Sequence, residues 1–195
     1  GEVIPQSTNS TPERRDPAHP PVPFEPPERC PSCGTPVVAG TDRGMLYCPN
    51  FACPARQLEG LVHFASRGGM DIRGLSYQRI QQFMEAGLVH DAADLYDLDV
   101  ERIVQQERFA EKSAENLVEA IAASKEQPLS RLLFALGMDN VGDTAAKQLA
   151  RHFGSMSRLQ EATAADILEI HGIGSIIADS AVAWFANEAA RELIA

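Results

Sequence analysis

Gly172-Ile173-Gly174 interrupts an apolar stretch that runs from Ile167 to Ala178. The residues on either side of the two glycines have helical spacing, so one helix is expected to end and another to begin there. Glycine tolerates a positive φ, and its missing Cβ lets another backbone or a ligand approach closely. The stretch therefore predicts a tight turn between two helices that presents bare backbone amides.

The same arrangement occurs three more times upstream. Asn140-Val141-Gly142 lies 32 residues earlier, Arg108-Phe109-Ala110 a further 32, and Gly74-Leu75-Ser76 a further 34. Apolar residues also stand four after, seven after and six before the last residue of each triplet: Ile80, Ala114, Ala146, Ala178; Phe83, Leu117, Leu149, Ala181; Met70, Val104, Leu136, Leu168. A period of about 20–50 residues marks an array of one recurring unit. We predict four helix-hairpin-helix units and call the triplets hairpins 1 to 4 in chain order.

The composition is that of a globular protein with an acidic balance. The chain has 195 residues, 44% of them hydrophobic, which allows one or two domains with a buried core. No apolar run approaches about 18 residues and no signal peptide is recognisable, so we expect a cytoplasmic protein. The net charge of −10 argues against general coating of nucleic acid, so any nucleic-acid-binding face would have to be local. Because the chain begins with glycine, we expect it to be cut from something longer.

Residues 1–28 predict no domain of their own. Residues 1–6 have the apolar content of a short strand and no more. Prolines then exclude a helix or a central strand and favour a semi-rigid linker; they are Pro12, Pro17, Pro20, Pro21, Pro23, Pro26 and Pro27. A ligand for an SH3-type domain is the alternative interpretation.

All cysteines of the chain fall between residues 29 and 57. They form the pattern C-x2-C-x14-C-x4-C, as Cys30, Cys33, Cys48 and Cys53. Two thiolate pairs on tight turns supply the tetrahedral sulfur set that zinc prefers. So short a segment buries little surface, and metal binding would provide much of its folding free energy. We predict a structural zinc site, with no open position for zinc chemistry.

Other interpretations of the cysteines remain open from the residues alone. A pair of disulfides is disfavoured in the cytosol, and a redox pair at Cys30 and Cys33 lacks the βαβ context of such pairs. His63 could replace a sulfur ligand. It follows the complete quartet in an apolar helical run, however, and is expected on a helix face.

The hairpins are the candidate DNA-binding sites. The first amides of a helix lack intrahelical partners and the helix dipole favours an anion there, so a phosphate group is the expected ligand. Small residues in hairpins 3 and 4 would let a DNA backbone lie against these amides, and nearby hydroxyl and basic groups would strengthen the contact. The candidate residues are Gly74, Lys112, Asn140, Val141, Gly142, Thr144, Lys147, Arg151, Gly172, Ile173, Gly174 and Ser175.

Hairpins 1 and 2 are weaker candidates. Ser76, Arg108 and Ala110 stand where hairpins 3 and 4 have small residues or glycine, so these two turns could be purely structural, with the apolar middle residue plugging the core. The alternative interpretation of the basic residues near the hairpins is that they are ordinary solvated surface residues. Trp184, in an apolar helical run, is expected in the core rather than stacked on a base. No catalytic motif is recognisable, so we do not expect a complete enzyme.

These motifs resemble the C-terminal half of the bacterial NAD-dependent DNA ligase. The resemblance covers nearly the whole chain. Residues 1–5 are similar to the end of that family's OB domain, residues 23–34 and 48–55 to the two ends of its zinc finger, and residues 63–75, 112–117 and 133–142 to its four-fold helix-hairpin-helix domain. The chain departs from the family at Arg56, usually glutamine, and at Arg108 and Ala110, where the second hairpin is usually glycine-rich. The departure at hairpin 2 argues against DNA contact there.

The resemblance implies a parent enzyme that seals nicks in duplex DNA during replication and repair. In that family a lysine is adenylated from NAD, the AMP passes to a 5′ phosphate, and a 3′ hydroxyl displaces it. The lysine, NAD and Mg²⁺ belong to N-terminal domains outside this chain, and a BRCT domain is expected after Ala195. The chain itself is therefore expected to bind DNA and to be inactive alone.

The sequence thus predicts a mainly α chain with three parts. An OB-domain remnant and Pro-rich linker occupy 1–28, a four-cysteine zinc finger 29–57, and a helix-hairpin-helix domain 58–195. The expected partners are nicked duplex DNA and the ligase's own adenylation, OB and BRCT domains, in the bacterial cytoplasm near the nucleoid. The alternatives are a non-enzymatic DNA-binding adaptor and a protein–protein scaffold.

Overall fold

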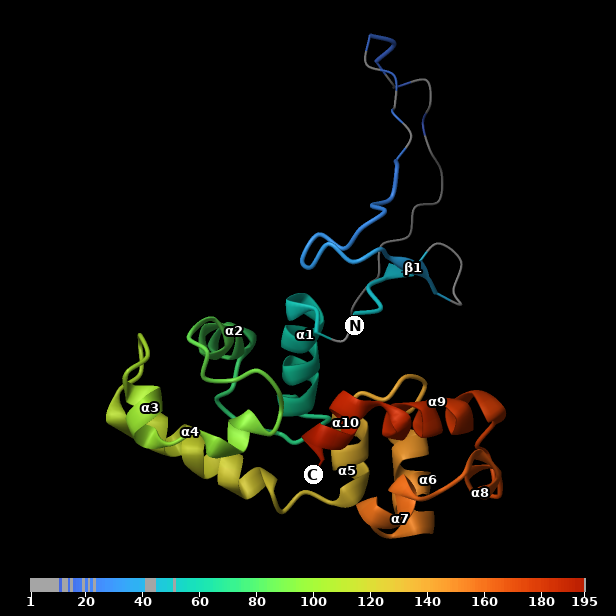
Figure 1. Cartoon of the computed structure of the whole chain (residues 1–195). Coiled ribbons are helices and arrows are strands. Elements are labelled where there is room, and N and C mark those ends of the chain that lie inside the picture. Colours follow the sequence, from blue (N-terminus) through green and yellow to red (C-terminus); the bar gives the residue numbers. More distant parts are fainter. Residues whose placement is uncertain are drawn as a thin grey trace. The chain divides into compact units, whose positions relative to one another are not determined.

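A computed structural model describes residues 11, 14, 16–18, 20, 22, 24–40, 45–50 and 52–194 (Figure 1). The chain divides into two compact units, residues 1–49 and 50–195, which are described one after the other. The expected strand at 1–6 and the side chain of Phe51 lie outside the described residues. No helix within the described ranges is long and apolar enough to cross a membrane.

The first unit contains a small antiparallel ribbon. Strand β1 (Val38–Ala39) pairs with β2 (Leu46–Tyr47), with Val38 opposite Tyr47 and Ala39 opposite Leu46. The apolar side chains of the ribbon remain open to solvent, since Val38, Leu46 and Tyr47 are 38%, 41% and 53% exposed. Two strands without a covered face are marginally stable at best. The ribbon therefore needs a further source of stability.

The second unit is a series of helices joined by short turns. Its elements in chain order are α1 (Pro54–Ala65), α2 (Tyr77–Glu85), the 3₁₀ helix η2 (Asp94–Asp97), α3 (Val100–Val104), α4 (Glu111–Ser124), α5 (Leu129–Ala135), α6 (Asp143–Phe153), α7 (Met156–Gln160), α8 (Ala164–Leu168), α9 (Ser175–Ala186) and α10 (Glu188–Leu193). Helices α1 and α2, α3 and α4, α5 and α6, and α8 and α9 pack in pairs, each pair across one hairpin. The prediction of a mainly α fold with helix-hairpin-helix units is confirmed.

The repeated apolar positions after each hairpin form the buried face of its second helix. The residues four and seven positions after each hairpin's last residue are all at most 1% exposed: Ile80, Phe83, Ala114, Leu117, Ala146, Leu149, Ala178 and Ala181. A spacing of three residues places both side chains on one helix face. The repeat in the sequence thus records one packing arrangement that is used four times.

The repeated position before each hairpin behaves differently. Val104 and Leu168 are 40% and 47% exposed, whereas the preceding residues Ile103 and Ile167 are fully buried. Helices α3 and α8 have five residues each, so only one or two positions of each can face the core. The core of these first helices is therefore one residue earlier than the position picked out by the repeat.

Each core of the helical unit is shared by two hairpins. One core gathers the units of hairpins 1 and 2, around Phe83, Leu95 and Leu117, and the other gathers those of hairpins 3 and 4, around Leu149 and Ile167. Trp184 packs against the second core, which agrees with its expected place.

Helix α5 belongs to both cores and links them. Its Ala135 faces the first core and its Leu133 the second. The ring of His63 in α1 donates from Nε2 to the carbonyl oxygen of Phe134 at 2.8 Å, and the two rings lie 4.7 Å apart. Arg131 donates from Nε to the Gly69 carbonyl at 2.8 Å. His63 thus has a position on a helix face at the junction of the two cores.

Candidate metal centre and nucleic-acid interface

The four cysteines lie together. Their sulfur atoms all lie within 4.8 Å of one another, in Cys30, Cys33, Cys48 and Cys53. Zinc–sulfur bonds of about 2.3 Å in a tetrahedron put the sulfurs about 3.8 Å apart. The Cys33 and Cys48 sulfurs are 3.4 Å apart, well beyond the roughly 2.05 Å of a disulfide bond. The cluster therefore supports a structural zinc site and not the disulfide alternative.

Local turns hold the cysteines in place. The Gly34 amide donates to the Cys30 carbonyl at 2.8 Å, which closes the turn that carries Cys30 and Cys33. Cys53 is the N-cap of α1, followed by Pro54 in the first helical turn, and its side chain is fully buried. A helix N-terminus favours the negative charge of a thiolate. The donor set is thus the one that zinc prefers, with sulfur at all four positions.

All four hairpins have the same backbone geometry. The first residue of each has a left-handed conformation, with φ of 88° at Gly74, 64° at Arg108, 62° at Asn140 and 90° at Gly172. The middle residue donates its amide to the carbonyl three residues earlier, and the last residue is the extended N-cap of the next helix. The chain therefore builds one turn four times from four different triplets.

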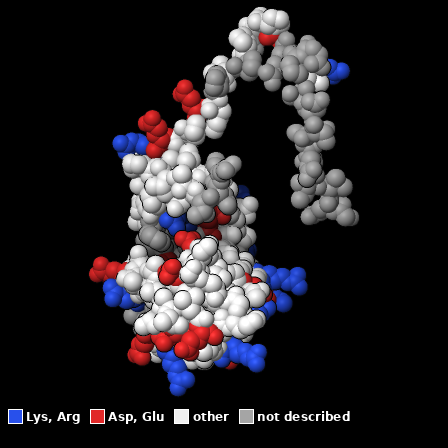
Figure 2. Space-filling view, turned by 90° about the vertical axis from the view of Figure 1, so that its right-hand side faces the viewer, with Lys and Arg blue, Asp and Glu red and all other residues white. Residues whose placement is uncertain are grey.

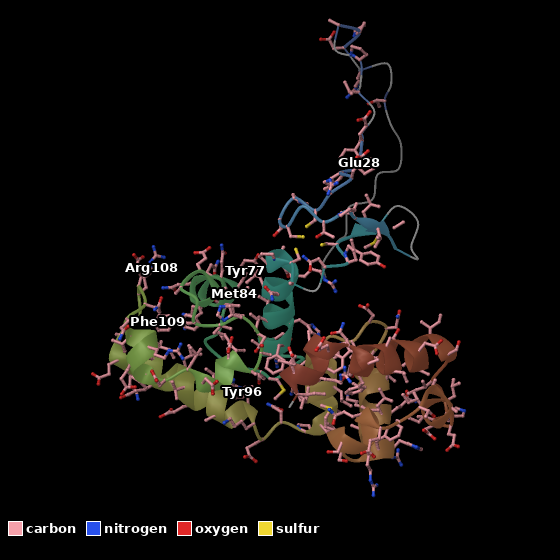
Figure 3. The ribbon with its side chains drawn as sticks, viewed as in Figure 1. Glu28, Tyr77, Met84, Tyr96, Arg108 and Phe109 are labelled. Carbon is pink, nitrogen blue, oxygen red and sulfur yellow. The ribbon has the colours of Figure 1, made fainter. Side chains whose placement is uncertain are left out.

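The middle residues of the hairpins are core plugs. Val141 and Ile173 are 4% and 7% exposed, and their amides donate to Met138 and Ile170 at 3.0 and 3.1 Å. Phe109 stacks on Phe83 with 5.6 Å between ring centroids. In Figure 3 Phe109 lies below Arg108, which is at the tip of hairpin 2. The amides that a ligand could reach therefore begin one residue later, at the N-cap.

The helix N-termini differ in their capping. At hairpin 1, Ser76 Oγ accepts from the Arg79 amide at 3.4 Å, and at hairpin 2 the Ala110 amide donates to Ser113 Oγ at 3.0 Å. The N-cap residues of hairpins 2, 3 and 4, Ala110, Gly142 and Gly174, make no side-chain cap hydrogen bond, and at hairpins 3 and 4 that residue is a glycine. The first-turn amides of α6 and α9 are therefore uncapped by side chains.

Hairpins 3 and 4 also have open space in front of them. A Cβ placed on Gly142 or Gly174 would meet no atom within 4 Å. Beside hairpin 3, a pocket of ≈ 480 Å³ is lined by His63, Phe134 and residues 137–142. Thr144 and Ser175 are exposed in the first turns of α6 and α9. The sequence-predicted residues of these two hairpins are thus brought to two accessible helix N-termini.

The candidate basic residues are dispersed, and two of them have acidic partners. Lys112 Nζ lies 3.1 Å from Glu115, and Lys147 Nζ lies 2.7 Å from Asp143. Arg151 is exposed near the end of α6. On the face in Figure 2, Lys and Arg are interspersed with Asp and Glu and separated by uncharged surface. Attraction of an anion to hairpins 3 and 4 would rest mainly on amides rather than on a basic patch.

Hydrogen bonds between hairpins form a feature that sequence reasoning missed. Gln148 Nε2 donates to the His171 carbonyl at 2.8 Å, just before hairpin 4, and Asn140 Nδ2 of hairpin 3 donates to Ser180 Oγ in α9 at 2.8 Å. Likewise, Gln82 Nε2 donates to the Glu107 carbonyl at 3.1 Å, just before hairpin 2. The sequence offers one partial signal, because the residue directly before the buried position seven after every hairpin is polar: Gln82, Asn116, Gln148 and Ser180.

Comparisons with known proteins agree with this arrangement. Residues 29–55 match the family described as NAD-dependent DNA ligase C4 zinc finger domain, and residues 131–194 match the helix-hairpin-helix motif. Similar proteins named DNA ligase occur in Gemmatimonas aurantiaca (54% identical), Pelotomaculum thermopropionicum (48%) and Anoxybacillus flavithermus (46%), each over 194 residues and 100% of this chain.

The chain spans only 28%, 28% and 29% of the length of these three relatives. Its two parts, a four-cysteine zinc site followed by helix-hairpin-helix units, are the parts that the family matches describe. The similarity to these ligases extends over the full chain and therefore includes both the zinc-finger part and the helix-hairpin-helix part. Over its whole length the chain therefore matches a C-terminal part of NAD-dependent DNA ligases.

Proposed function

We propose that this chain is the DNA-binding part of a ligase that seals nicks in duplex DNA during replication and repair, and that it performs no chemistry itself. The observation that carries the proposal is the pair of uncapped, unobstructed helix N-termini at Gly142 and Gly174. Amides there donate hydrogen bonds to phosphate oxygens, and the helix dipole favours the same anion. The similarity to DNA ligases supports DNA as the source of the phosphates.

Hairpins 3 and 4 make the main contacts in this proposal. Phosphate oxygens accept from first-turn amides at Gly142 and Gly174, with the hydroxyls of Thr144 and Ser175 beside them. Such contacts position the DNA without reading its sequence. Val141 and Ile173 contribute by shaping the turns, since their side chains are buried.

The remaining candidates have secondary roles. Lys147, Arg151 and Lys112 add long-range attraction to the backbone. At hairpin 1 the Gly74 carbonyl already accepts from Arg79 Nη1 at 2.6 Å, and its helix N-terminus is capped by Ser76. Hairpin 1 is therefore a weaker DNA contact than hairpins 3 and 4.

The cysteine quartet Cys30, Cys33, Cys48 and Cys53 would hold zinc in a structural role in this proposal, which fits the all-sulfur donor set. The proposed domains are a linker with an OB-domain remnant at 1–28, the zinc finger at 29–57 and the helix-hairpin-helix domain at 58–195. NAD, Mg²⁺ and the adenylated lysine enter through other domains of the ligase, so the chain alone is inactive. Its partners are nicked duplex DNA and the adenylation, OB and BRCT domains, in the cytoplasm close to the nucleoid.

The test is DNA binding by the zinc-loaded chain at low salt, measured by gel shift with nicked and intact duplexes of one sequence. Gly142→Val and Gly174→Val place a side chain in front of the amides, and we expect each to weaken binding roughly tenfold, about 1.4 kcal/mol. Gly60→Val is the matched control, since a Cβ on Gly60 in α1 also meets no atom within 4 Å.

Absence of binding by the unaltered chain, or full binding by both hairpin variants, would contradict the proposal. Full binding by Gly60→Val shows that a new valine on an open helix surface is harmless in itself. Within the described residues, nothing favours a non-enzymatic adaptor or a protein–protein scaffold over the ligase.

A further inference from the structure

Hairpins 3 and 4 are joined by two hydrogen bonds, both donated by residues on the side of hairpin 3. From the side of hairpin 3, Gln148 in α6 donates to the His171 carbonyl, and Asn140 donates to Ser180 in α9. The bonded residues are 23 and 40 positions apart in the chain, so the bonds connect separate units rather than neighbours. Each bond ends within one or two turns of an uncapped helix N-terminus.

Gly172 makes room for the first of these bonds. A Cβ on Gly172 would lie 3.1 Å from Gln148 Nε2, closer than most real Cβ contacts. Gly172 also has a φ of 90°, which side chains rarely adopt. Glycine at this position therefore serves the turn and the approach of the Gln148 amide together.

We infer that Gln148 and Asn140 are positioning residues that hold hairpins 3 and 4 at one fixed separation, so that both helix N-termini engage the DNA backbone at once. The inference rests on the proposed DNA-binding function and names residues that neither the family matches nor the similar proteins assign. When one hairpin binds, the other is held near its own phosphate at a high effective concentration. A loose pair would lose that advantage, because each hairpin would have to find its phosphate independently.

The pair of hairpins 1 and 2 supplies an internal control. Gln82 occupies the same place as Gln148, six residues after its hairpin, and donates to the carbonyl just before hairpin 2 at 3.1 Å. At each hairpin of that pair a serine hydroxyl accepts a hydrogen bond from a backbone amide at the helix N-terminus: Ser76 at hairpin 1 and Ser113 at hairpin 2. Loss of the Gln82 bond should therefore lower the stability of the chain as much as loss of the Gln148 bond does. It should weaken DNA binding much less.

The experiment compares Gln148→Met with Gln82→Met in the full zinc-loaded chain, with a nicked duplex as the probe. Methionine keeps the length of the side chain and removes its donor. We expect Gln148→Met to weaken DNA binding by roughly fivefold to tenfold, the range of one or two lost hydrogen bonds, and Gln82→Met by less than about twofold. Thermal unfolding of both variants should shift by a similar small amount.

A double-mutant cycle separates positioning from a merely structural role. With hairpin 4 blocked by Gly174→Val, no pair of hairpins remains to be positioned. Adding Gln148→Met to that variant should therefore weaken its DNA binding by less than about twofold. If Gln148→Met only damaged the structure, it would weaken DNA binding by the same factor in the unaltered chain and in the Gly174→Val variant. Ser180→Ala removes the acceptor of the second bond and should behave like Gln148→Met in both backgrounds.

The outcomes distinguish this inference from the proposed function. If Gly142→Val and Gly174→Val weaken binding but Gln148→Met and Ser180→Ala do not, the positioning inference is overturned and the DNA-binding function stands. Equal losses for Gln148→Met and Gln82→Met, or equal losses with and without Gly174→Val, would also overturn it. If none of the hairpin variants changes binding, the proposed function itself fails.

Discussion

Arg108 carries a backbone conformation that suits its side chain poorly. Its φ is 64°, in the region that glycine or asparagine occupies in the other three hairpins. A side chain there costs roughly 1–2 kcal/mol, because Cβ approaches the following carbonyl oxygen. The cost is tolerated because Phe109 is anchored between neighbours, stacked on Phe83 and under the Arg79 guanidinium at 4.5 Å.

Replacing Arg108 by glycine should therefore stabilise the chain. We expect Arg108→Gly to raise the free energy of unfolding by about 0.5–1 kcal/mol, since relief of strain exceeds the entropy that glycine loses on folding. Urea unfolding of the zinc-loaded chain measures this. Gln105→Gly, three residues earlier at a φ of −69°, is the control and should destabilise. A loss of stability in Arg108→Gly would show that the turn does not strain its side chain.

Two glycines of the neighbouring hairpins should respond in opposite ways to alanine. Gly172→Ala places a Cβ at a φ of 90° and 3.1 Å from Gln148 Nε2, so we expect a loss of about 1–2 kcal/mol in the free energy of unfolding. Gly142→Ala places it at a φ of −77° in open space, so we expect no loss or a gain of up to about 1 kcal/mol. Equal effects in urea unfolding would contradict the geometry of the two turns.

At the scale of single elements, two short helices begin at carboxylates that accept hydrogen bonds. Hydrogen bonds from the Thr163 hydroxyl and amide hold the pKa of Asp166, at the start of α8, below its ordinary value. Burial acts to raise the pKa of Asp94, in η2, but hydrogen bonds from His90 and Asp91 outweigh it, and the net shift is downward. Both carboxylates stabilise the fold in their ionised form.

Acid should loosen these two elements first. A lowered carboxyl pKa contributes stability that is complete above the unfolded value of about 3.9 and is lost as the pH falls through the folded value. We expect faster amide exchange at Thr163 and at His90 as the pH falls below about 4, after correction for intrinsic rates. Asp166→Asn should remove this pH dependence at Thr163 and leave it at His90. An unchanged pH dependence at Thr163 in that variant would refute the role of Asp166.

The zinc site and the helical unit should respond differently to a chelator. The ribbon of β1 and β2 leaves its apolar side chains exposed, whereas both cores of the helical unit consist of residues from Leu58 onward. Because metal binding supplies folding free energy to so small a unit, we expect zinc removal to unfold residues around the cysteines and to leave helical circular dichroism nearly unchanged. Amide exchange at Gly40, which donates to the Met45 carbonyl beside the ribbon, and far-ultraviolet circular dichroism check this, with zinc added back as the control. Cooperative loss of both signals would contradict it.

At the scale of the whole molecule, the net charge of −10 bears on how DNA binding depends on salt. Hydrogen bonds from amides release few counterions, and Lys147 and Arg151 are the basic residues proposed to support hairpin 3. At about 0.9 per neutralised phosphate, the slope of log K against log salt should be near −2, far shallower than for a lysine-rich patch. Changing Lys147 or Arg151 to glutamine should each make the slope shallower by about 1. A slope steeper than about −5 would indicate a basic surface instead.

The sequence predicted those features that depend on nearby residues. The spacing of four cysteines predicted the cluster, and the positions four and seven after each hairpin predicted eight buried side chains. It placed the core of α3 and α8 one residue too late, because five-residue helices are too short to display a period. It did not predict the capping of hairpin 2, since Ser113 reaches back three residues to Ala110 only when the turn has formed.

The sequence by itself determined the four-cysteine pattern, the four hairpins and the apolar face behind each one, because these follow from the spacing of residues along the chain. Only the tertiary structure decided which hairpins pair, and that Gln148 reaches His171 while Asn140 reaches Ser180. These bonds join residues 23 and 40 positions apart. The repeat marks a polar residue at Gln148 and at Ser180 but does not give the partner of either, because the partners meet only after hydrophobic packing has brought separate helix pairs together.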